Sequence, residues 1–163
     1  MFKKYLIVFL VSMIPLIELR GAVPIGLSDA FGGALPILPL YITCIIGNML
    51  PVPVIFFFAR KVLVWGADKK FIGKIFKFCL EKGEKGGKKL QEKAGHGLYF
   101  ALFLFVGIPL PGTGAWTGTL AASLLDMDFK KSTIAVMAGV VLAGIIMGLA
   151  SAGVFGAVGA IFN

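Results

Sequence analysis

An acid and a base stand inside one apolar stretch near the start of the chain. Glu18 and Arg20 lie in the segment IELRGAVPIG, residues 17–26, directly behind a charge-free run from Phe9 to Ile17. An ionisable side chain inside a membrane segment is costly and usually faces a cavity or a partner. Arg20, with its planar fork of donors, suits a phosphate or carboxylate headgroup. Glu18 is the matching candidate for binding a coupling proton, and the alternative is that the two charges pair with each other.

A second segment, IPLPGTGAWTG at residues 108–118, has no charge but offers backbone and hydroxyl groups. Glycines expose amide N–H groups there, and a half-helix that starts near Trp116 would add a partial positive end. Tryptophan is also enriched at membrane interfaces, so Trp116 is equally compatible with an anchoring role. We predict an anion-binding site built from Arg20 and from Gly112, Thr113, Gly114, Trp116 and Thr117.

Both segments contain residues that interrupt a helix, namely Pro15, Gly21 and Pro24 in the first and Pro109 and Pro111 in the second. Both also begin with the same tripeptide, Ile-Pro-Leu, at 14–16 and at 108–110. The same offset places the apolar block 35–59 on the apolar block 132–162. This order, a broken block followed by a whole block and then repeated, is typical of the internal repeats of transporters.

The composition predicts an all-α integral membrane protein. Of the 163 residues 58% are hydrophobic and 15% are charged, with a mean hydropathy of +0.95. A bilayer span needs about 20 apolar residues, and each side of the two breaks is shorter than that. We therefore predict re-entrant hairpins at 5–31 and 97–125 and full spans at 35–59 and 132–162, arranged as an inverted repeat.

These elements are predicted to form a single membrane domain, 1–163, with a first repeat at 1–59, a linker at 60–96 and a second repeat at 97–163. The alternative is four plain transmembrane helices. The two arrangements differ in their termini, because two hairpins place both ends outside the cell and four helices place both inside. Non-helical backbone at membrane depth must be covered by protein or water, which favours hairpins whose tips meet near the midplane.

The linker carries most of the charge. Residues 60–96 hold eleven Lys or Arg and four Asp or Glu, a net +7 of the chain's +8. Basic residues beside short loops stay on the cytoplasmic side. Residues 68–82 have apolar side chains at helical spacing, which predicts a basic amphipathic helix, and we expect residues 68–93 to contact the lipids of an anionic leaflet. The linker has no recognisable nucleic-acid-binding motif, so no nucleic-acid partner is predicted.

Small residues follow helical faces of the last apolar block, as in Gly144-x-x-x-Gly148. Such residues let helices approach closely in lipid, so the face at 135–160 is predicted to pack either inside the protein or in a homo-oligomer. Cys44, Cys79 and His96 lack the spacing of metal ligands. With no nucleophile–base set and no phosphate-binding loop, we predict neither an enzyme nor a bound cofactor or metal.

The motifs ELRGAVPIG and PLPGTGAWTG resemble those of the small multidrug export protein family, and the resemblance covers essentially the whole chain. That family is similar in its two-hairpin plan to the DedA-type (VTT) superfamily. The resemblance implies a transporter-like, multi-pass protein of a prokaryotic plasma membrane. The DedA-type relatives imply movement of anionic lipids such as polyprenyl phosphates, driven by a proton or sodium gradient. Their pattern separates the acid and the arginines between two hairpins, whereas Glu18 and Arg20 share one.

The sequence therefore predicts a transporter that translocates an anionic amphiphile. Two alternatives stay open. In the first, the protein exports cationic drugs and Glu18 binds the cation. In the second, it is a non-transporting membrane scaffold, with the glycine face and the basic helix as its working parts.

Overall fold

The computed structural model describes residues 2–15, 17–28, 33–69, 73–75, 77–78, 81, 92, 95, 97–110 and 112–162, with side chains as far as residue 153. Regular structure in these ranges is helical. The helices are α1 (Phe2–Met13), α2 (Glu18–Leu27), α3 (Ile37–Met49), α4 (Pro51–Ala67), α6 (Gly97–Gly107), α7 (Ala115–Leu124) and α8 (Phe129–Phe162).

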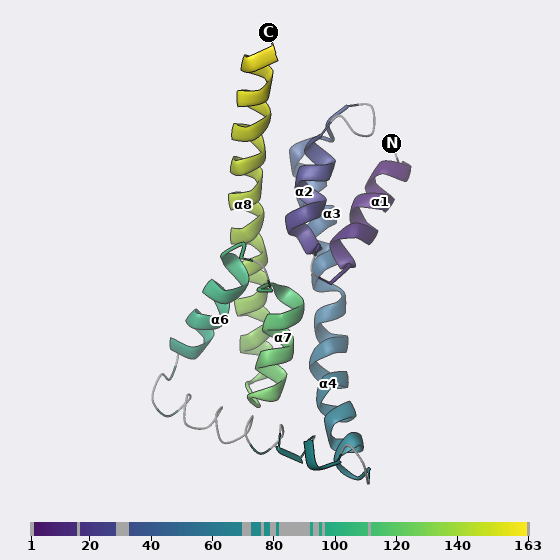
Figure 1. Ribbon diagram of the computed structural model, residues 1–163, viewed down its shortest axis with the longest axis vertical. Coiled ribbons are helices and arrows are strands. Elements are labelled where there is room, and N and C mark those ends of the chain that lie inside the picture. Colours follow the sequence, from purple (N-terminus) through teal and green to yellow (C-terminus); the bar gives the residue numbers. More distant parts are fainter. Residues whose placement is uncertain are drawn as a thin grey trace.

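Two long helical columns lie along the long axis of the molecule, α8 extending further at the upper end and α4 at the lower end (Figure 1). One is α3 followed by α4, interrupted at Leu50, where Pro51 has no N–H to continue the helical hydrogen bonds. The other is α8. Ile37–Ala67, with 31 residues, and Phe129–Gly153, with 25, are long and apolar enough to cross a membrane. The all-helical class and the two spanning helices are thus confirmed, although the first span extends well beyond its predicted end at residue 59.

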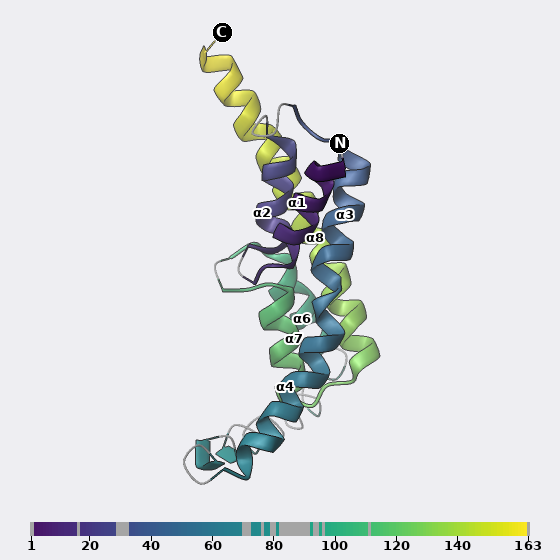
Figure 2. The same ribbon diagram turned by 90° about the vertical axis from the view of Figure 1, so that its right-hand side faces the viewer.

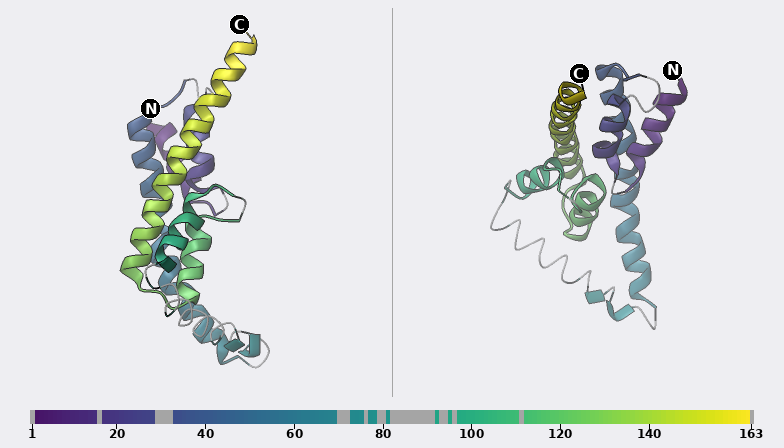
Figure 3. Two further views of the ribbon diagram at one scale, coloured as in Figure 1. Left: turned by 90° about the vertical axis from the view of Figure 1, so that its left-hand side faces the viewer. Right: turned by 45° about the horizontal axis from the view of Figure 1, so that its top comes forward.

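Two shorter helical pairs pack on the columns, with α2 and α7 between the columns, α1 on the outer side of α3 and α6 on the outer side of α8 (Figure 1). We call α1 with α2 the first hairpin and α6 with α7 the second hairpin. The first descends from one end of the molecule and the second rises from the other, so that their tips face each other at mid-height (Figures 1 and 2). The first hairpin packs on α3 and α8, and the second packs on α4 and α8. Figure 3 shows α8 passing beside both of them.

The core joins these layers through fully buried side chains such as Val8, Leu19, Leu40, Val106 and Val136. Many large apolar side chains are instead exposed, among them Phe58 on α4 and Leu149 on α8. A soluble protein rarely exposes so much contiguous apolar surface. The outer surface is suited to lipid, as the composition predicts.

Glycines in the first two thirds of α8 pack against neighbouring helices inside the protein. Gly139 lies against Val106 of α6, and Gly144 and Gly148 lie against the Tyr41 ring of α3. The Tyr41 hydroxyl donates a hydrogen bond of 2.8 Å to the Gly144 carbonyl. The internal packing that we predicted for the small-residue face therefore holds at these three glycines. A homo-oligomer through 135–160 stays a prediction.

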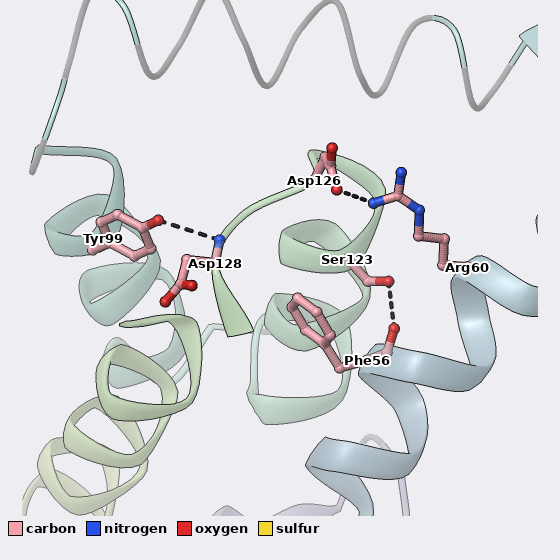
Figure 4. A network of polar contacts seen from close by, with 6 residues as sticks. All are labelled: Phe56, Arg60, Tyr99, Ser123, Asp126 and Asp128. Carbon is pink, nitrogen blue, oxygen red and sulfur yellow. Dashed lines mark hydrogen bonds and ion pairs between the residues drawn. The ribbon is translucent and has the colours of Figure 1, made fainter. Parts of the chain in front are cut away.

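Polar contacts tie the elements together at the end opposite both termini (Figure 4). Arg60 of α4 forms an ion pair with Asp126, which follows α7. One helical turn away, the Ser123 hydroxyl donates to the Phe56 carbonyl at 2.6 Å. These contacts hold α4 to the base of the second hairpin. They lie far from the hairpin tips, where the predicted site residues gather.

Most of the basic linker lies outside the described residues, including Cys79 and His96. The described parts at 73–75, 77–78 and 81 are helical, and Ile75 and Phe78 expose their side chains. The predicted amphipathic helix at 68–82 and its contact with an anionic leaflet stay predictions.

Candidate functional site

The break in the first hairpin is a short turn. Helix α1 ends at Met13 and α2 begins at Glu18, with Pro15 in the bend between them. Contrary to prediction, Gly21 and Pro24 do not interrupt a helix, because both lie inside α2. Proline within a helix is tolerated in membrane proteins where neighbouring helices and side chains compensate the lost hydrogen bond. Helix α2 packs on α3 and α8, which supply such neighbours.

The break in the second hairpin is longer, and its described residues are 108–110 and 112–114, between α6 and α7. Pro109 lies in it as predicted, whereas Pro111 falls outside the described residues. Gly112 and Gly114 have φ angles of 81° and 146°. Residues with a side chain rarely adopt such angles, so the two glycines allow the chain to turn here.

Glu18 reaches across to the start of α7. Its carboxylate oxygens accept hydrogen bonds from the amides of Ala115, at 3.1 Å, and Trp116, at 3.0 Å. The first amides of a helix have no intrahelical partner and carry a partial positive charge. Glu18 is 4% exposed, and its backbone has a strained φ of 51°. A buried carboxylate of the protein itself thus occupies the place predicted to attract an anion.

Arg20 reaches the other end of the same break. One terminal nitrogen donates to the carbonyls of Leu110, at 2.8 Å, and Thr113, at 2.7 Å. The other donates to Val106, at 3.0 Å, and Ile108, at 3.2 Å. We call these four oxygens the carbonyl cluster. They include the last turn of α6, whose negative end favours a cation.

Glu18 and Arg20 therefore form no ion pair with each other. Within the part of the chain that the structure describes, the Glu18 carboxylate bonds to amides and the Arg20 guanidinium to carbonyls. Residues two apart on a helix point to different sides. Here one side of α2 meets the start of α7 and the other meets the end of α6. The negative charge of Glu18 thus lies at the positive N-terminal end of α7, and the positive charge of Arg20 lies at the negative C-terminal end of α6.

Trp116 adds a third link between the tips. Its indole N–H donates to the carbonyl of Met13, the last residue of α1, at 3.2 Å. The Thr113 hydroxyl is bonded within the second hairpin, to the carbonyls of Ile108 and Leu110, at 2.9 Å each. The Thr117 hydroxyl makes a longer contact of 3.4 Å with the Gly114 carbonyl. Of the predicted site residues, Gly112 alone stands apart, exposed and with open space around it.

Sequence reasoning missed the acceptors in this site. The carbonyls of Met13, Val106, Ile108 and Leu110 belong to apolar residues whose side chains carry no signal. The one available hint was positional, since the last carbonyls of any interrupted helix need partners. Gly114 shows how tight the fit is, because a Cβ on that residue would collide with the Glu18 carboxylate.

Apolar grooves lie beside the tips. One, of about 340 Å³, has Pro15 and Leu120 in its lining, and another, of about 420 Å³, has Met13 and Val54 in its lining. They share Ile55, Phe58 and Trp116 in their linings. The tips thus combine charged and backbone polar groups with apolar surface.

Comparison with known proteins identifies the family. The sequence profile described as "Putative small multi-drug export protein" matches residues 18–146. The chain belongs to this family. The match begins at Glu18 and takes in α2, the column of α3 and α4, the second hairpin and the first half of α8. No curated protein and no solved structure matches the chain. None of the comparisons bears on the DedA-type relationship, which stays a prediction. The family's name and the apolar helices together indicate a transporter-like membrane protein.

Proposed function

We propose that this small multi-drug export family member translocates an anionic amphiphile across a prokaryotic plasma membrane. The observation that carries the proposal is the buried contact between a carboxylate, that of Glu18, and the amides of Ala115 and Trp116. An anionic headgroup has the same chemistry as that carboxylate and suits the same helix end. The apolar grooves beside Trp116 suit the hydrocarbon tail.

In this proposal the two hairpins are re-entrant, and each forms one half of an inverted repeat together with the span that follows it. Their helices have 10 to 12 residues. At 1.5 Å per residue each is about 15–18 Å long, which is too short to cross a hydrocarbon core of about 30 Å. The opposed orientation of the hairpins supports the proposal that they enter the membrane from opposite faces (Figure 1). The basic linker, 60–96, then lies in the cytoplasm, where its charge attracts anionic lipid.

Glu18 is the proposed proton-coupling residue. Protonation of its carboxylate removes the negative charge from the start of α7 and frees one oxygen from its role as an acceptor. The amide of Ala115 or Trp116 that loses its acceptor is then available to a substrate anion. Proton binding and anion binding would thus favour the same state of the tips, as coupled transport requires. Polyprenyl phosphates, which the DedA-type resemblance implies, are one lipid class of this chemistry.

The test uses purified protein in proteoliposomes that contain a fluorescent polyprenyl-phosphate analogue, with and without a pH gradient. We expect wild-type protein to move the analogue faster with the gradient. Glu18→Gln should lose that dependence, whereas Glu81→Gln, which changes an exposed glutamate, should retain it. Lipid movement that is equally fast with and without the wild-type protein would refute the proposal.

The same vesicles test the alternatives. Export of a cationic dye that depends on Glu18, without lipid movement, would favour the drug exporter. This second function has an observation of its own, since the carbonyl cluster around Arg20 already binds a cationic group. If neither dye nor lipid moves, the non-transporting scaffold becomes the better explanation.

A further inference from the structure

The carbonyl cluster has the composition of a cation site. One of its four oxygens belongs to Val106 in the last turn of α6, and the others belong to Ile108, Leu110 and Thr113, which lie outside the helices. In transporters with interrupted helices, unwound carbonyls and half-helix C-terminal ends are the groups that coordinate sodium. Here the same kinds of group surround the guanidinium of Arg20. The side chain acts as a cation that is tethered to the opposite hairpin.

Arg20 links the two hairpins, each of which packs mainly against the long helices and not against the other hairpin. The first hairpin rests chiefly on α3 and α8 and the second on α4 and α8. At the tips they are linked by the hydrogen bonds of Glu18, Arg20 and Trp116. Separating the tips therefore breaks polar contacts and leaves most of the apolar core in place. The Arg20 contact is the part of this joint that a dissolved cation is able to replace.

Departure of Arg20 removes its donors from the four carbonyls. Those of Ile108 and Leu110 keep other donors, namely the Thr113 hydroxyl and backbone amides. The part-buried carbonyls of Val106 and Thr113 lose the guanidinium that bonds to them, and a buried polar group without a partner is unfavourable, which disfavours an empty cluster. The cluster opens at the surface of the molecule, because the Arg20 contacts with the carbonyls of Leu110 and Ile108 are exposed and Gly112 is exposed as well. An incoming cation satisfies the carbonyls that Arg20 releases, so the exchange is easier than the departure alone.

We propose that the carbonyl cluster is an exchangeable binding site for a small monovalent cation, with Arg20 as its resident ligand when the tips are joined. The cation has two sources, an inorganic ion such as sodium or the guanidinium-type headgroup of an organic cation. Its transport role, which rests on the proposed function, is to stabilise the state in which the tips have separated. Binding itself does not depend on what the protein transports.

The experiment measures cation binding to purified full-length protein in detergent micelles. Radioactive sodium is followed by equilibrium dialysis, and the melting temperature is followed while choline chloride is replaced by sodium chloride or by millimolar guanidinium chloride at constant ionic strength. The variants are Arg20→Ala, which empties the cluster, and Arg60→Ala. Arg60→Ala is the matched control because it removes an arginine of similar exposure that pairs with Asp126 far from the tips.

We expect Arg20→Ala to melt at a lower temperature and to regain about half of that loss or more when a cation occupies the cluster. Wild type and Arg60→Ala should respond weakly, because Arg20 competes for the site. Recovery with sodium identifies the inorganic source, and recovery with guanidinium identifies the organic one. If neither cation raises the melting temperature of Arg20→Ala above the change in Arg60→Ala, and no sodium is bound, the proposal is overturned.

Arg20→Lys covers the case in which Arg20→Ala does not fold. Lysine keeps the charge but has one compact ammonium group in place of the planar fork, so part of the cluster becomes available. Sodium bound by Arg20→Lys beyond the wild-type amount supports the site, and an equal amount overturns it. Intact cation binding without lipid movement in proteoliposomes would refute the proposed function while leaving this site standing.

Discussion

Replacing Glu18 by glutamine tests whether this carboxylate holds the start of α7. The substitution keeps the size of the side chain and its unusual backbone angle, a φ of 51°. It removes the charge and converts one acceptor oxygen into an NH₂ donor. That donor would face an amide that is itself a donor, either that of Ala115 or that of Trp116. One of the two contacts must therefore be lost.

The size of the effect follows from the two bonds. A hydrogen bond to a charged group contributes about 1.5–3 kcal/mol, and a neutral one contributes about 1 kcal/mol. Losing one bond and weakening the other, in a site that is 4% exposed, destabilises the protein by about 3 kcal/mol. For a chain of this length that corresponds to a fall of about 6–12 °C in melting temperature.

The assay is thermal unfolding in detergent micelles, followed by the fluorescence of Trp116. The chain has two tryptophans, so a Trp65→Phe background leaves the reporter in the site alone. Glu81→Gln, at an exposed position, should shift the melting temperature by less than about 2 °C. An equally small shift for Glu18→Gln would show that the carboxylate does not stabilise α7, and the proposed anion site would lose its support.

Three further predictions use the same melting assay. Gly114→Ala presses a methyl group against the Glu18 carboxylate at a φ of 146° and should cost about 3 kcal/mol, whereas Gly112→Ala, at 81° with open space, should cost about 1 kcal/mol. Equal losses at the two glycines would contradict the contact with Glu18. Tyr41→Phe removes a 2.8 Å hydrogen bond to an α8 carbonyl and should cost about 1 kcal/mol; an unchanged melting temperature would show that the bond contributes nothing. Thr119→Val deletes a buried hydroxyl that has no hydrogen-bond partner among the described residues, so we expect a gain of about 1 kcal/mol, and a loss would indicate a partner.

The sequence allowed the elements of this fold to be predicted because their signals are local. Apolar runs long enough to cross a bilayer identified the two columns, and proline identified the break after Gly107. The same local reasoning was wrong at Pro24. Proline removes one hydrogen bond, but whether a helix ends there depends on its neighbours. Helix α2 continues where it packs on α3 and α8.

The partners of the site were beyond local reasoning. Glu18 and Arg20 were recognised as unusual, yet the alternatives considered were a substrate or each other. The structure pairs them with backbone groups that lie 86 to 98 residues away in the sequence. Backbone amides and carbonyls are present at every residue, so no residue type marks them. What selects these particular groups is the position of two helix ends, which follows only once the hairpins are packed.

The contacts at the tips also constrain any transport cycle. Glu18 cannot hold the amides of α7 while a substrate anion binds to them, and Arg20 cannot fill the carbonyl cluster while another cation occupies it. Both charges lie on α2, so a movement of that helix relative to the second hairpin would release both helix ends together. The anion site and the cation site would then become available in the same state. Occupation of either one would stabilise the separated tips and so favour occupation of the other. If both proposals hold, the charges of the first hairpin would couple the two binding events by occupying both sites in the absence of anion and cation.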